Sequence, residues 1–211
     1  MSAPQSYYVP VDAGEAEFTE KRSRFLGHVR RVETEAEARA FLDEMRKKYY
    51  DARHNCWCYI IRGGAERYSD DGEPQGTAGI PMLEVFRREG VTNVVCVVTR
   101  YFGGVLLGAG GLLRAYTKSA KDALTAAGVS AVRRWVELDI PCSYAQSEKL
   151  KLEIAAAGGV VAGMDYAAGV TIKALAPEER AEDFCARIFD ISAGSVQPVV
   201  TGEVFRAVPV R

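Results

Sequence analysis

The run "NVVCVVTR" at residues 93–100 constrains the fold of this chain more than any other segment. Its side chains are apolar almost throughout, whereas a strand with one solvated face alternates apolar and polar residues. A strand of this kind is stable only when other elements cover both of its faces. We therefore predict a central strand here, with packed layers on each side.

Two glycine-rich segments flank this strand, "DDGEPQGTAG" at 70–79 and "RYFGGVLLGAGGLLRAY" at 100–116. Loops that only connect elements do not need so much conformational freedom. The second segment leaves the strand and enters a helix, and exposed N–H groups at a helix start form a natural anion site. Its spacing matches neither GxGxxG nor GxxxxGK[ST], so no nucleotide motif is present. Close packing of the helix on the sheet is the alternative reason for these glycines.

Basic and aromatic side chains accompany the second segment. Arg114, Lys118 and Lys121 recur at helical spacing and share one face, where they can follow a phosphate backbone. Phe102 and Tyr116 are aromatic residues that can stack on an unpaired base. The residues that we expect to contact an anion are Arg100, Tyr101, Gly103, Gly104, Gly108, Gly110, Gly111, Arg114 and Lys118.

The acidic segment is open to three interpretations. Its carboxylates can ligate a hard cation through oxygen, pair with Arg100 or Arg114 to hold the two loops together, or recognise a partner. Asp-Gly followed by proline is also typical of an ordinary turn. The loop residues that we expect beside the anion site are His54, Asn55, Asp70, Asp71, Glu73, Gly76 and Thr77.

His54 lies just before the predicted strand at 56–62, two residues before Cys56, so in extended backbone the two side chains share a face. A Cys–His pair is one interpretation, but nothing in the sequence completes a triad. We expect instead that His54 and Asn55 hydrogen-bond to nearby loops. No catalytic residue, metal site or cofactor is predicted.

Hydrophobic periodicity divides the chain into two α+β domains, at 1–134 and 135–211. A capping box at Thr34 and Glu37 begins the first helix, and a second box at Ser143 and Gln146 begins a later one. Pro177 is expected to begin the last helix. The N-terminal elements are strands at 25–32, 56–62, 65–69 and 93–100, a helix after Thr34 and a helix at 110–127. Beyond them we expect a strand at 128–141, a helix ending at Gly158, strands at 160–166 and 169–175, a helix from Pro177 and a strand within 195–209, in the order β-α-β-β-α-β.

The composition narrows the class of protein. The chain has 211 residues, 48% of them hydrophobic, which is ordinary for a globular protein. No apolar run approaches the roughly 18 residues of a membrane span, and the start lacks the pattern of a signal peptide. Five scattered cysteines favour a reducing cytoplasm. Residues 21–134 contain 20 basic and 13 acidic side chains, which suits a surface that faces a polyanion unless the charges cluster by chance.

Four segments together resemble the IMPACT/YigZ family over roughly residues 18–127: "SRF" (23–25), "HNC" (54–56), "SDDGEPQGTAG" (69–79) and "VVTRYFGGVLLGAGGLLRAY" (97–116). The resemblance implies an N-terminal domain like domain 2 of ribosomal protein S5, with a sheet backed by two helices. It also implies a ferredoxin-like C-terminal domain similar to the last domain of elongation factor G. Ile80 and Leu106 stand where the family pattern leads us to expect lysine, and their presence would weaken an anion site.

The resemblance also implies a role in translation. Eukaryotic relatives regulate translation by competing for a scaffold protein, and bacterial members have been considered nucleic-acid or ribosome binders. The leading hypothesis is therefore a non-catalytic cytoplasmic protein that binds RNA, the ribosome or a translation factor. The alternatives are an enzyme acting on a phosphorylated small molecule, with Asp70 or Asp71 as the acid, and a protein–protein regulator that docks through its acidic C-terminal domain. The oligomeric state is left open.

Overall fold

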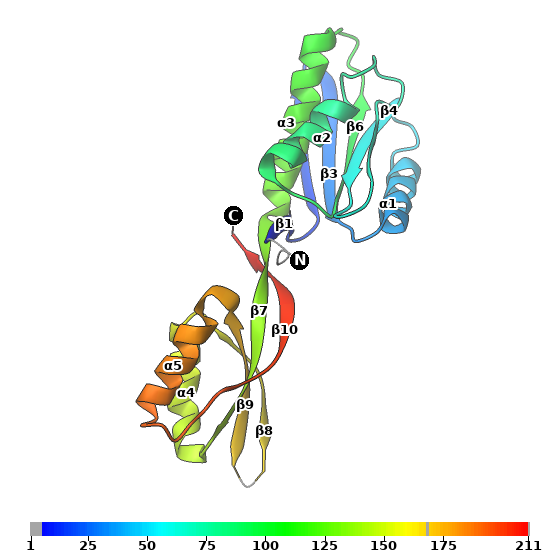
Figure 1. Cartoon of the computed structure of the whole chain (residues 1–211). Coiled ribbons are helices and arrows are strands. Elements are labelled where there is room, and N and C mark those ends of the chain that lie inside the picture. The colour runs from blue at the N-terminus through cyan, green and yellow to red at the C-terminus, as the bar shows by residue number, and fades with distance from the viewer. Residues whose placement is uncertain (1–5, 168, 211) are drawn as a thin grey trace. The chain divides into compact units, whose positions relative to one another are not determined.

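The computed structural model describes residues 6–167 and 169–210 (Figure 1). The chain divides into two compact units, which are described separately below. The N-terminal unit comprises Tyr7–Ala131 together with residues 207–210, and the C-terminal unit comprises Val132–Arg206. None of the helices in these described ranges is both long enough and apolar enough to cross a membrane.

The N-terminal unit is built on an antiparallel sheet with the strand order β2-β3-β6-β4-β5. Strand β6 occupies the centre, and its residues are buried except for the half-buried last one, as the apolar run predicts. The strands of this sheet are β2 (Gly14–Glu20), β3 (Ser23–Arg31), β4 (His54–Ile60), β5 (Glu66–Ser69) and β6 (Val94–Tyr101).

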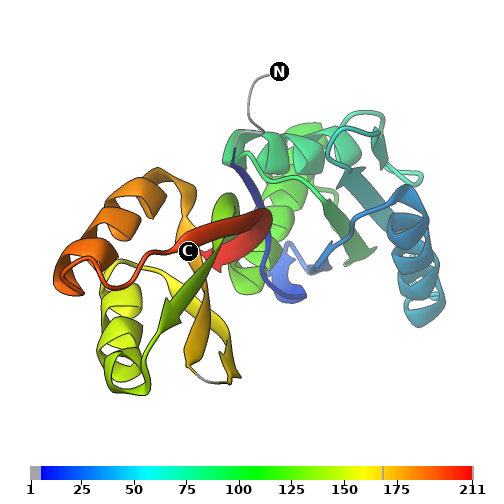
Figure 2. The same cartoon turned by 60° about the horizontal axis from the view of Figure 1, so that its bottom comes forward.

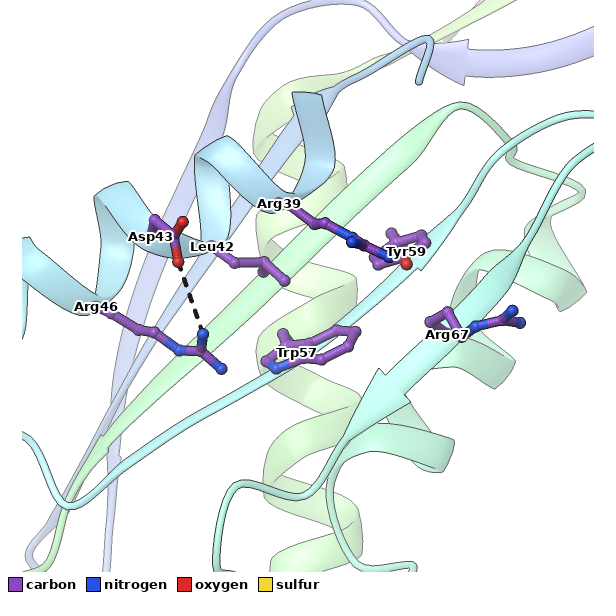
Figure 3. Close-up of a pocket in the computed structure, with 7 residues that line it drawn as sticks. All are labelled: Arg39, Leu42, Asp43, Arg46, Trp57, Tyr59 and Arg67. Atoms are coloured by element: carbon purple, nitrogen blue, oxygen red, sulfur yellow. Dashed lines mark ion pairs between the residues drawn. The ribbon is translucent and has the colours of Figure 1, made fainter. Parts of the chain in front are cut away.

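Helices cover both faces of this sheet, which confirms the prediction for the central strand (Figures 1 and 2). Cys56 and Cys58 of β4 pack under α2 (Gly79–Glu89) and α3 (Ala109–Ala127). The alternate residues Trp57 and Tyr59 pack on the opposite face, where α1 (Glu35–Lys48) lies (Figure 3). The sheet is therefore backed by two helices on one face and by a third helix on the other.

Local signals explain where the helices begin and end. The Thr34 hydroxyl accepts a hydrogen bond from the Glu37 N–H at 3.2 Å, so the predicted cap of α1 is present. The Glu37 carboxylate accepts from the N–H of Glu33, one residue earlier than in the usual capping box. Helix α2 ends at Gly90, which adopts the left-handed conformation that is common after a helix.

The C-terminal unit follows the predicted β-α-β-β-α-β order. Strand β7 (Val129–Cys142) pairs with β9 and with β10, and β8 pairs with β9. The Gln146 side chain accepts a hydrogen bond from the Ser143 N–H at 3.0 Å, so the second predicted capping box is present. The remaining elements are α4 (Tyr144–Ala156), β8 (Val160–Tyr166), β9 (Val170–Pro177), α5 (Ala181–Ile191) and β10 (Val199–Pro209).

Several elements differ from the sequence prediction. The strands β1 (Tyr7–Pro10) and β2 and the helix α2 were not predicted at all. Helix α2 begins at Gly79, the last residue of the acidic segment, and Gly79 and Pro81 in its first turn mask its helical spacing. Pro177 ends β9 instead of beginning a helix, since a short 3-10 turn at Glu178–Arg180 precedes α5.

The packing of α3 on the sheet gives a test of this arrangement. A Cβ atom added at Gly27 of β3 would lie 2.6 Å from the backbone oxygen of Ser119 in α3. We therefore expect Gly27→Ala to reduce the free energy of unfolding by about 1–3 kcal/mol, because backbone atoms must move apart. The measurement is urea unfolding of the full chain.

Gly163 serves as the control for that substitution. It lies in β8, and an added Cβ there would meet no atom within 4 Å. Gly163→Ala should change the free energy of unfolding by no more than about 0.5 kcal/mol. Equal effects of the two substitutions would contradict close packing of α3 on β3.

Candidate functional site

The two glycine-rich segments meet in the N-terminal unit around one cavity of about 340 Å³, here called the loop cavity. The acidic loop (70–78) and the glycine loop (102–108) form opposite parts of its wall, and the starts of β4 and α3 complete it. The lining residues are Arg53, His54, Gly72, Glu73, Pro74, Arg100, Phe102, Leu106, Leu107, Gly108, Ala109 and Leu112.

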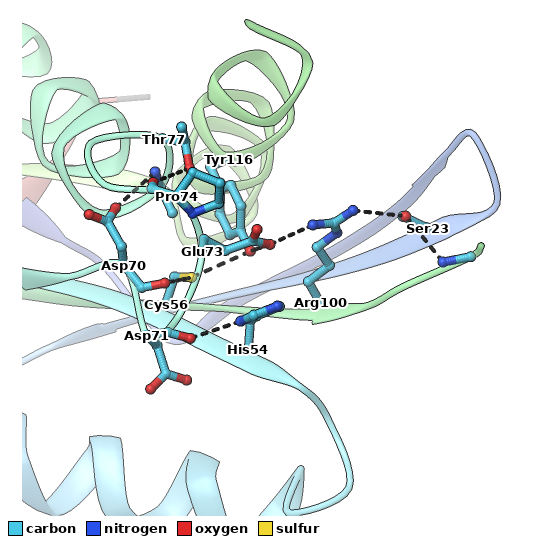
Figure 4. Close-up of polar contacts among 12 residues, drawn as sticks. Ser23, His54, Cys56, Asp70, Asp71, Glu73, Pro74, Thr77, Arg100 and Tyr116 are labelled. Atoms are coloured by element: carbon cyan, nitrogen blue, oxygen red, sulfur yellow. Dashed lines mark hydrogen bonds and ion pairs between the residues drawn. The ribbon is translucent and has the colours of Figure 1, made fainter. Parts of the chain in front are cut away.

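A buried ion pair joins the two loops. Glu73 of the acidic loop accepts a hydrogen bond from Nη1 of Arg100 at 2.6 Å, and both side chains are almost fully buried. The Tyr116 hydroxyl of α3 donates to the same Glu73 oxygen at 2.8 Å. Figure 4 shows Glu73 pointing at Arg100. Of the three interpretations of the acidic loop, pairing with Arg100 is therefore present in the structure.

The Arg100 side chain is buried beneath the two loops. Its exposed fraction is only 5%, its Nη2 lies 3.3 Å from the Ser23 hydroxyl, and its guanidinium lies 5.5 Å from the ring centres of Phe25 and Phe102. The sequence left open whether the acidic loop pairs with Arg100 or Arg114, and the structure places Glu73, 27 residues away in the chain, beside Arg100. Its Nε–H has no partner among the described residues, although Arg100 lines the loop cavity.

Asp70 gives the acidic loop its shape. Its carboxylate accepts hydrogen bonds from the backbone N–H groups of Gly76, Ala78 and Gly79 at 2.8–3.0 Å. Two of these N–H groups belong to the start of α2, where a negative charge also interacts favourably with the helix dipole. The Thr77 hydroxyl adds a bond to the carbonyl of Pro74 at 2.6 Å.

The start of β4 fastens the acidic loop from the other side. Nδ1 of His54 lies 2.8 Å from the carbonyl oxygen of Asp71, so Nδ1 carries the proton and donates. The Asn55 N–H donates to the Asp71 carboxylate at 2.6 Å, and the Thr99 hydroxyl donates to the Asn55 side chain at 2.7 Å. The prediction that His54 and Asn55 hydrogen-bond to a nearby loop is confirmed.

Cys56 and Tyr116 complete the buried network beneath the loop. The Cys56 sulfur lies 3.0 Å from the carbonyl oxygen of Asp70 and 3.4 Å from the Tyr116 hydroxyl. Burial raises the pKa of the Cys56 thiol and the pKa of Tyr116 far above their ordinary values. A nucleophilic cysteine needs a lowered pKa, so this environment does not support Cys–His chemistry.

The glycine loop is held close to the hairpin between β2 and β3. A Cβ atom on Gly103 would lie 2.0 Å from the backbone carbon of Arg22, and the Gly103 N–H donates to the Ser23 hydroxyl at 3.2 Å. Gly108 then precedes α3 as its N-cap residue and has no side chain to accept the first N–H groups of the helix. Close packing and an accessible helix start therefore occur in the same loop.

Three other predicted site residues lie outside the loop cavity. Arg114 and Lys118 line a hollow of about 140 Å³ against Phe18 of β2, and Lys118 also pairs with Asp122. The Tyr101 hydroxyl donates to Asp51 at 2.8 Å. Among the other predicted glycines, Gly76 and Gly104 have positive φ, and a Cβ atom added at either would meet no atom within 4 Å. A Cβ atom added at Gly110 would lie near the Arg114 side chain, and one at Gly111 would lie against Leu107.

Sequence reasoning named Phe102 and Leu106 separately but missed Arg53 and the rim that these three residues form around the loop cavity. Leu106 has an exposed fraction of 81% and Phe102 one of 45%, and Arg53 is also exposed. The run "VLL" inside a glycine-rich loop was an available signal, because loops seldom place large apolar side chains in solvent without a partner. Among the residues that the structure describes, no group of three or more His, Cys, Asp or Glu side chains is arranged to hold a metal ion.

Comparison with known proteins identifies the family. The model of the Impact N-terminal domain matches residues 21–124, and that of a domain of unknown function, DUF1949, matches residues 140–195. The chain is 36% identical over 191 residues to the IMPACT family member YvyE of Bacillus subtilis (strain 168), covering 90% of this chain and 88% of that protein. This chain belongs to the IMPACT family.

Other relatives agree with this membership. IMPACT family member YigZ of Escherichia coli (strain K12) is 34% identical over 181 residues, which cover 84% of this chain and 89% of YigZ. Protein IMPACT of Rattus norvegicus is 33% identical over 112 residues, but these cover only 35% of that protein. A solved structure described as a hypothetical protein is 31% identical, covers 95% of this chain and 99% of its own, and superposes with a TM-score of 0.59.

The buried ion pair gives a test of the site's architecture. Glu73→Ala would leave the Arg100 guanidinium buried without its carboxylate and should reduce the free energy of unfolding by about 3–5 kcal/mol. Tyr116→Phe removes one hydrogen bond to the same carboxylate and should cost only about 1 kcal/mol. Chemical unfolding of both variants measures the difference, and a Glu73→Ala variant as stable as Tyr116→Phe would contradict the coupling of the loops.

Proposed function

We propose that this protein acts in translation control by binding single-stranded RNA at the loop cavity. The observation that carries the proposal is the joining of an uncapped helix start, a buried guanidinium with a free N–H and an exposed aromatic ring in one hollow. Each of these groups suits a different part of a nucleotide, and they belong to elements that the Glu73–Arg100 ion pair holds together.

The phosphate would lie at the start of α3. The first N–H groups of a helix point at such a ligand, and the helix dipole favours negative charge there. Nε of Arg100 supplies an unused donor, and Arg53 supplies an exposed positive charge on the rim. Charge-assisted hydrogen bonds of this kind give affinity for phosphate without dependence on base sequence.

The base would lie against the glycine loop. Phe102 is the exposed aromatic residue of the cavity, and stacking of a base on an aromatic ring contributes about 1–3 kcal/mol. Leu106 adds an apolar surface beside it where the family pattern had suggested lysine. Recognition in this chain would thus depend more on stacking and apolar contact than on an added lysine charge.

Fold and family support a role in translation. The element order of the C-terminal unit, with β7 between β9 and β10, supports a ferredoxin-like domain, and the N-terminal unit supports an S5-domain-2-like assignment. Both domain types recur in translation machinery, and the family resemblance implies regulation of translation in eukaryotic relatives. By analogy with those proteins, the two domain types support RNA as the partner. Cytoplasmic RNA, within or outside the ribosome, is the partner that we propose.

The contacts of the acidic loop argue against the proposed metabolite enzyme. Asp70 accepts three backbone hydrogen bonds, and Asp71 accepts one from Asn55. These hydrogen bonds fix the position of the loop. The two residues suggested as a catalytic acid therefore already have structural partners.

Two substitutions test the proposal by different physical signatures. Arg53→Ala should lower affinity for a short single-stranded RNA about tenfold and reduce the slope of log affinity against log salt by about 1. Phe102→Ala should lower affinity by about 1–3 kcal/mol with an unchanged salt slope, since stacking releases no counterions. Fluorescence anisotropy over a salt series measures both quantities.

Arg88→Ala is the matched control. Arg88 is an exposed arginine in the last turn of α2, away from the acidic loop where that helix begins. Its removal changes the net charge by the same amount as Arg53→Ala and should leave the affinity within about twofold. Equal losses for Arg53→Ala and Arg88→Ala would mean that RNA senses only overall charge, and the proposed site would be wrong.

A further inference from the structure

A second hollow lies on the face of the N-terminal sheet that α1 covers, between α1 and the edge strand β5. Its volume is about 390 Å³, within the range of small-ligand sites, and it is called here the Arg–Trp groove (Figure 3). The sheet contributes Trp57, Tyr59 and Arg67 to its wall. Because α2 and α3 pack on the opposite face, this groove is separate from the loop cavity.

Backbone geometry brings the basic residues of the groove together. Arg67 of β5 is directly opposite Tyr59 of β4, so their side chains share a face of the sheet with Trp57. On α1, Arg39 and Arg46 lie on the same helical face, seven residues apart. All three arginines line the groove, and Figure 3 shows Arg39 beside Tyr59 and Arg46 reaching toward Trp57, whereas the Arg67 guanidinium extends away from the aromatic pair.

Two of these arginines, Arg39 and Arg46, are held only weakly by their present partners. Arg39 lies 3.4 Å from Glu35, and Arg46 lies 3.7 Å from Asp43, in both cases between solvent-exposed side chains. Exposed pairs of this kind contribute little, so a guanidinium can exchange its carboxylate for a phosphate at small cost. Among the described residues that line the groove, three are arginines and only Asp43 is acidic.

The aromatic part of the groove has an unused hydrogen-bond donor. The rings of Trp57 and Tyr59 are nearly parallel, with centroids 5.6 Å apart and an angle of 6° between planes. The Trp57 side chain is half-buried, and its Nε1–H is buried without a partner among the described residues. A buried unpaired N–H is unfavourable, so a ligand that brings an acceptor would relieve this cost.

We propose that the Arg–Trp groove binds a nucleoside phosphate. The base would stack on the Trp57 ring, a ribose or phosphate oxygen at the ring edge would accept a hydrogen bond from its Nε1–H, and the guanidinium groups of Arg39 and Arg46 would bind the phosphate. An acidic peptide would satisfy the arginines but would leave the flat aromatic surface and the indole donor unused. The nucleoside phosphate can be a free nucleotide or one nucleotide of an RNA strand, since both present the same groups.

Tryptophan fluorescence reports on this groove directly. The chain has two tryptophans, Trp57 and Trp135, and Trp135 lies in the C-terminal unit. AMP, adenosine and a short single-stranded RNA would be titrated separately into the full chain. We expect saturable quenching by AMP that Trp57→Phe abolishes and that adenosine produces at least tenfold more weakly. Quenching by the RNA alone, if Arg46→Ala weakens it, would identify the nucleotide as part of a strand.

Charge-matched neighbours on α1 provide the decisive comparison. Arg46→Ala should weaken the interaction at least tenfold, whereas Lys47→Ala, at the next position of the same helix and also exposed, should leave it within twofold. Arg53→Ala, in the loop cavity, should not change the Trp57 signal, so failure at one site does not imply failure at the other. No saturable quenching by AMP or RNA, or equal effects of Arg46→Ala and Lys47→Ala, would overturn the proposal.

Discussion

The buried pair of Glu73 and Arg100 is the interaction on which the N-terminal unit depends most. It links the acidic loop to the end of the central strand, and the Tyr116 hydroxyl connects the same carboxylate to α3. Two charges removed from water are stable only when each finds good geometry and further hydrogen bonds. Ser23, which also binds the glycine loop, and the Tyr116 hydroxyl supply those bonds, so the loops are held in one arrangement.

This arrangement explains how glycine-rich loops can be ordered. Glycine costs more conformational entropy on folding than other residues, and a loop rich in it needs compensating contacts. Asp70 provides them in the acidic loop through its backbone hydrogen bonds, while Gly103 fits against the backbone of Arg22 in the other loop. The loop cavity lies between the two ordered loops, with backbone N–H donors at the start of α3 and apolar side chains on its rim.

The two hollows of the N-terminal unit differ in chemistry although the same sheet supports both. The loop cavity lies at the ends of β4 and β6 and has few free charges, since its buried arginine is paired. The Arg–Trp groove lies on the α1 face and has guanidinium groups whose partners are exposed. Alternation along β4 causes the difference, because Cys56 and Trp57 point to opposite faces.

Local sequence patterns by themselves determined much of the fold. The apolar run of β6, the cap at Thr34 and the β-α-β-β-α-β order are encoded by residues close together in the chain, so periodicity reveals them. Helix α2 escaped detection because glycine and proline at its start outweigh its apolar spacing locally, while burial against the sheet stabilises it. The positions of the two loops were also predicted from the sequence, with Glu73 among the expected loop residues.

Only the tertiary structure decided which of these residues meet. The sequence allowed the acidic loop to pair with either Arg100 or Arg114, and only the fold places Glu73 beside Arg100. Arg39 and Arg67 belong to one groove only because α1 lies over β4. Register and helix placement follow from the burial of the whole apolar set, which is a property of the complete chain. A single residue type therefore predicts chemistry, whereas packing determines whether that chemistry is buried and paired or open to a ligand.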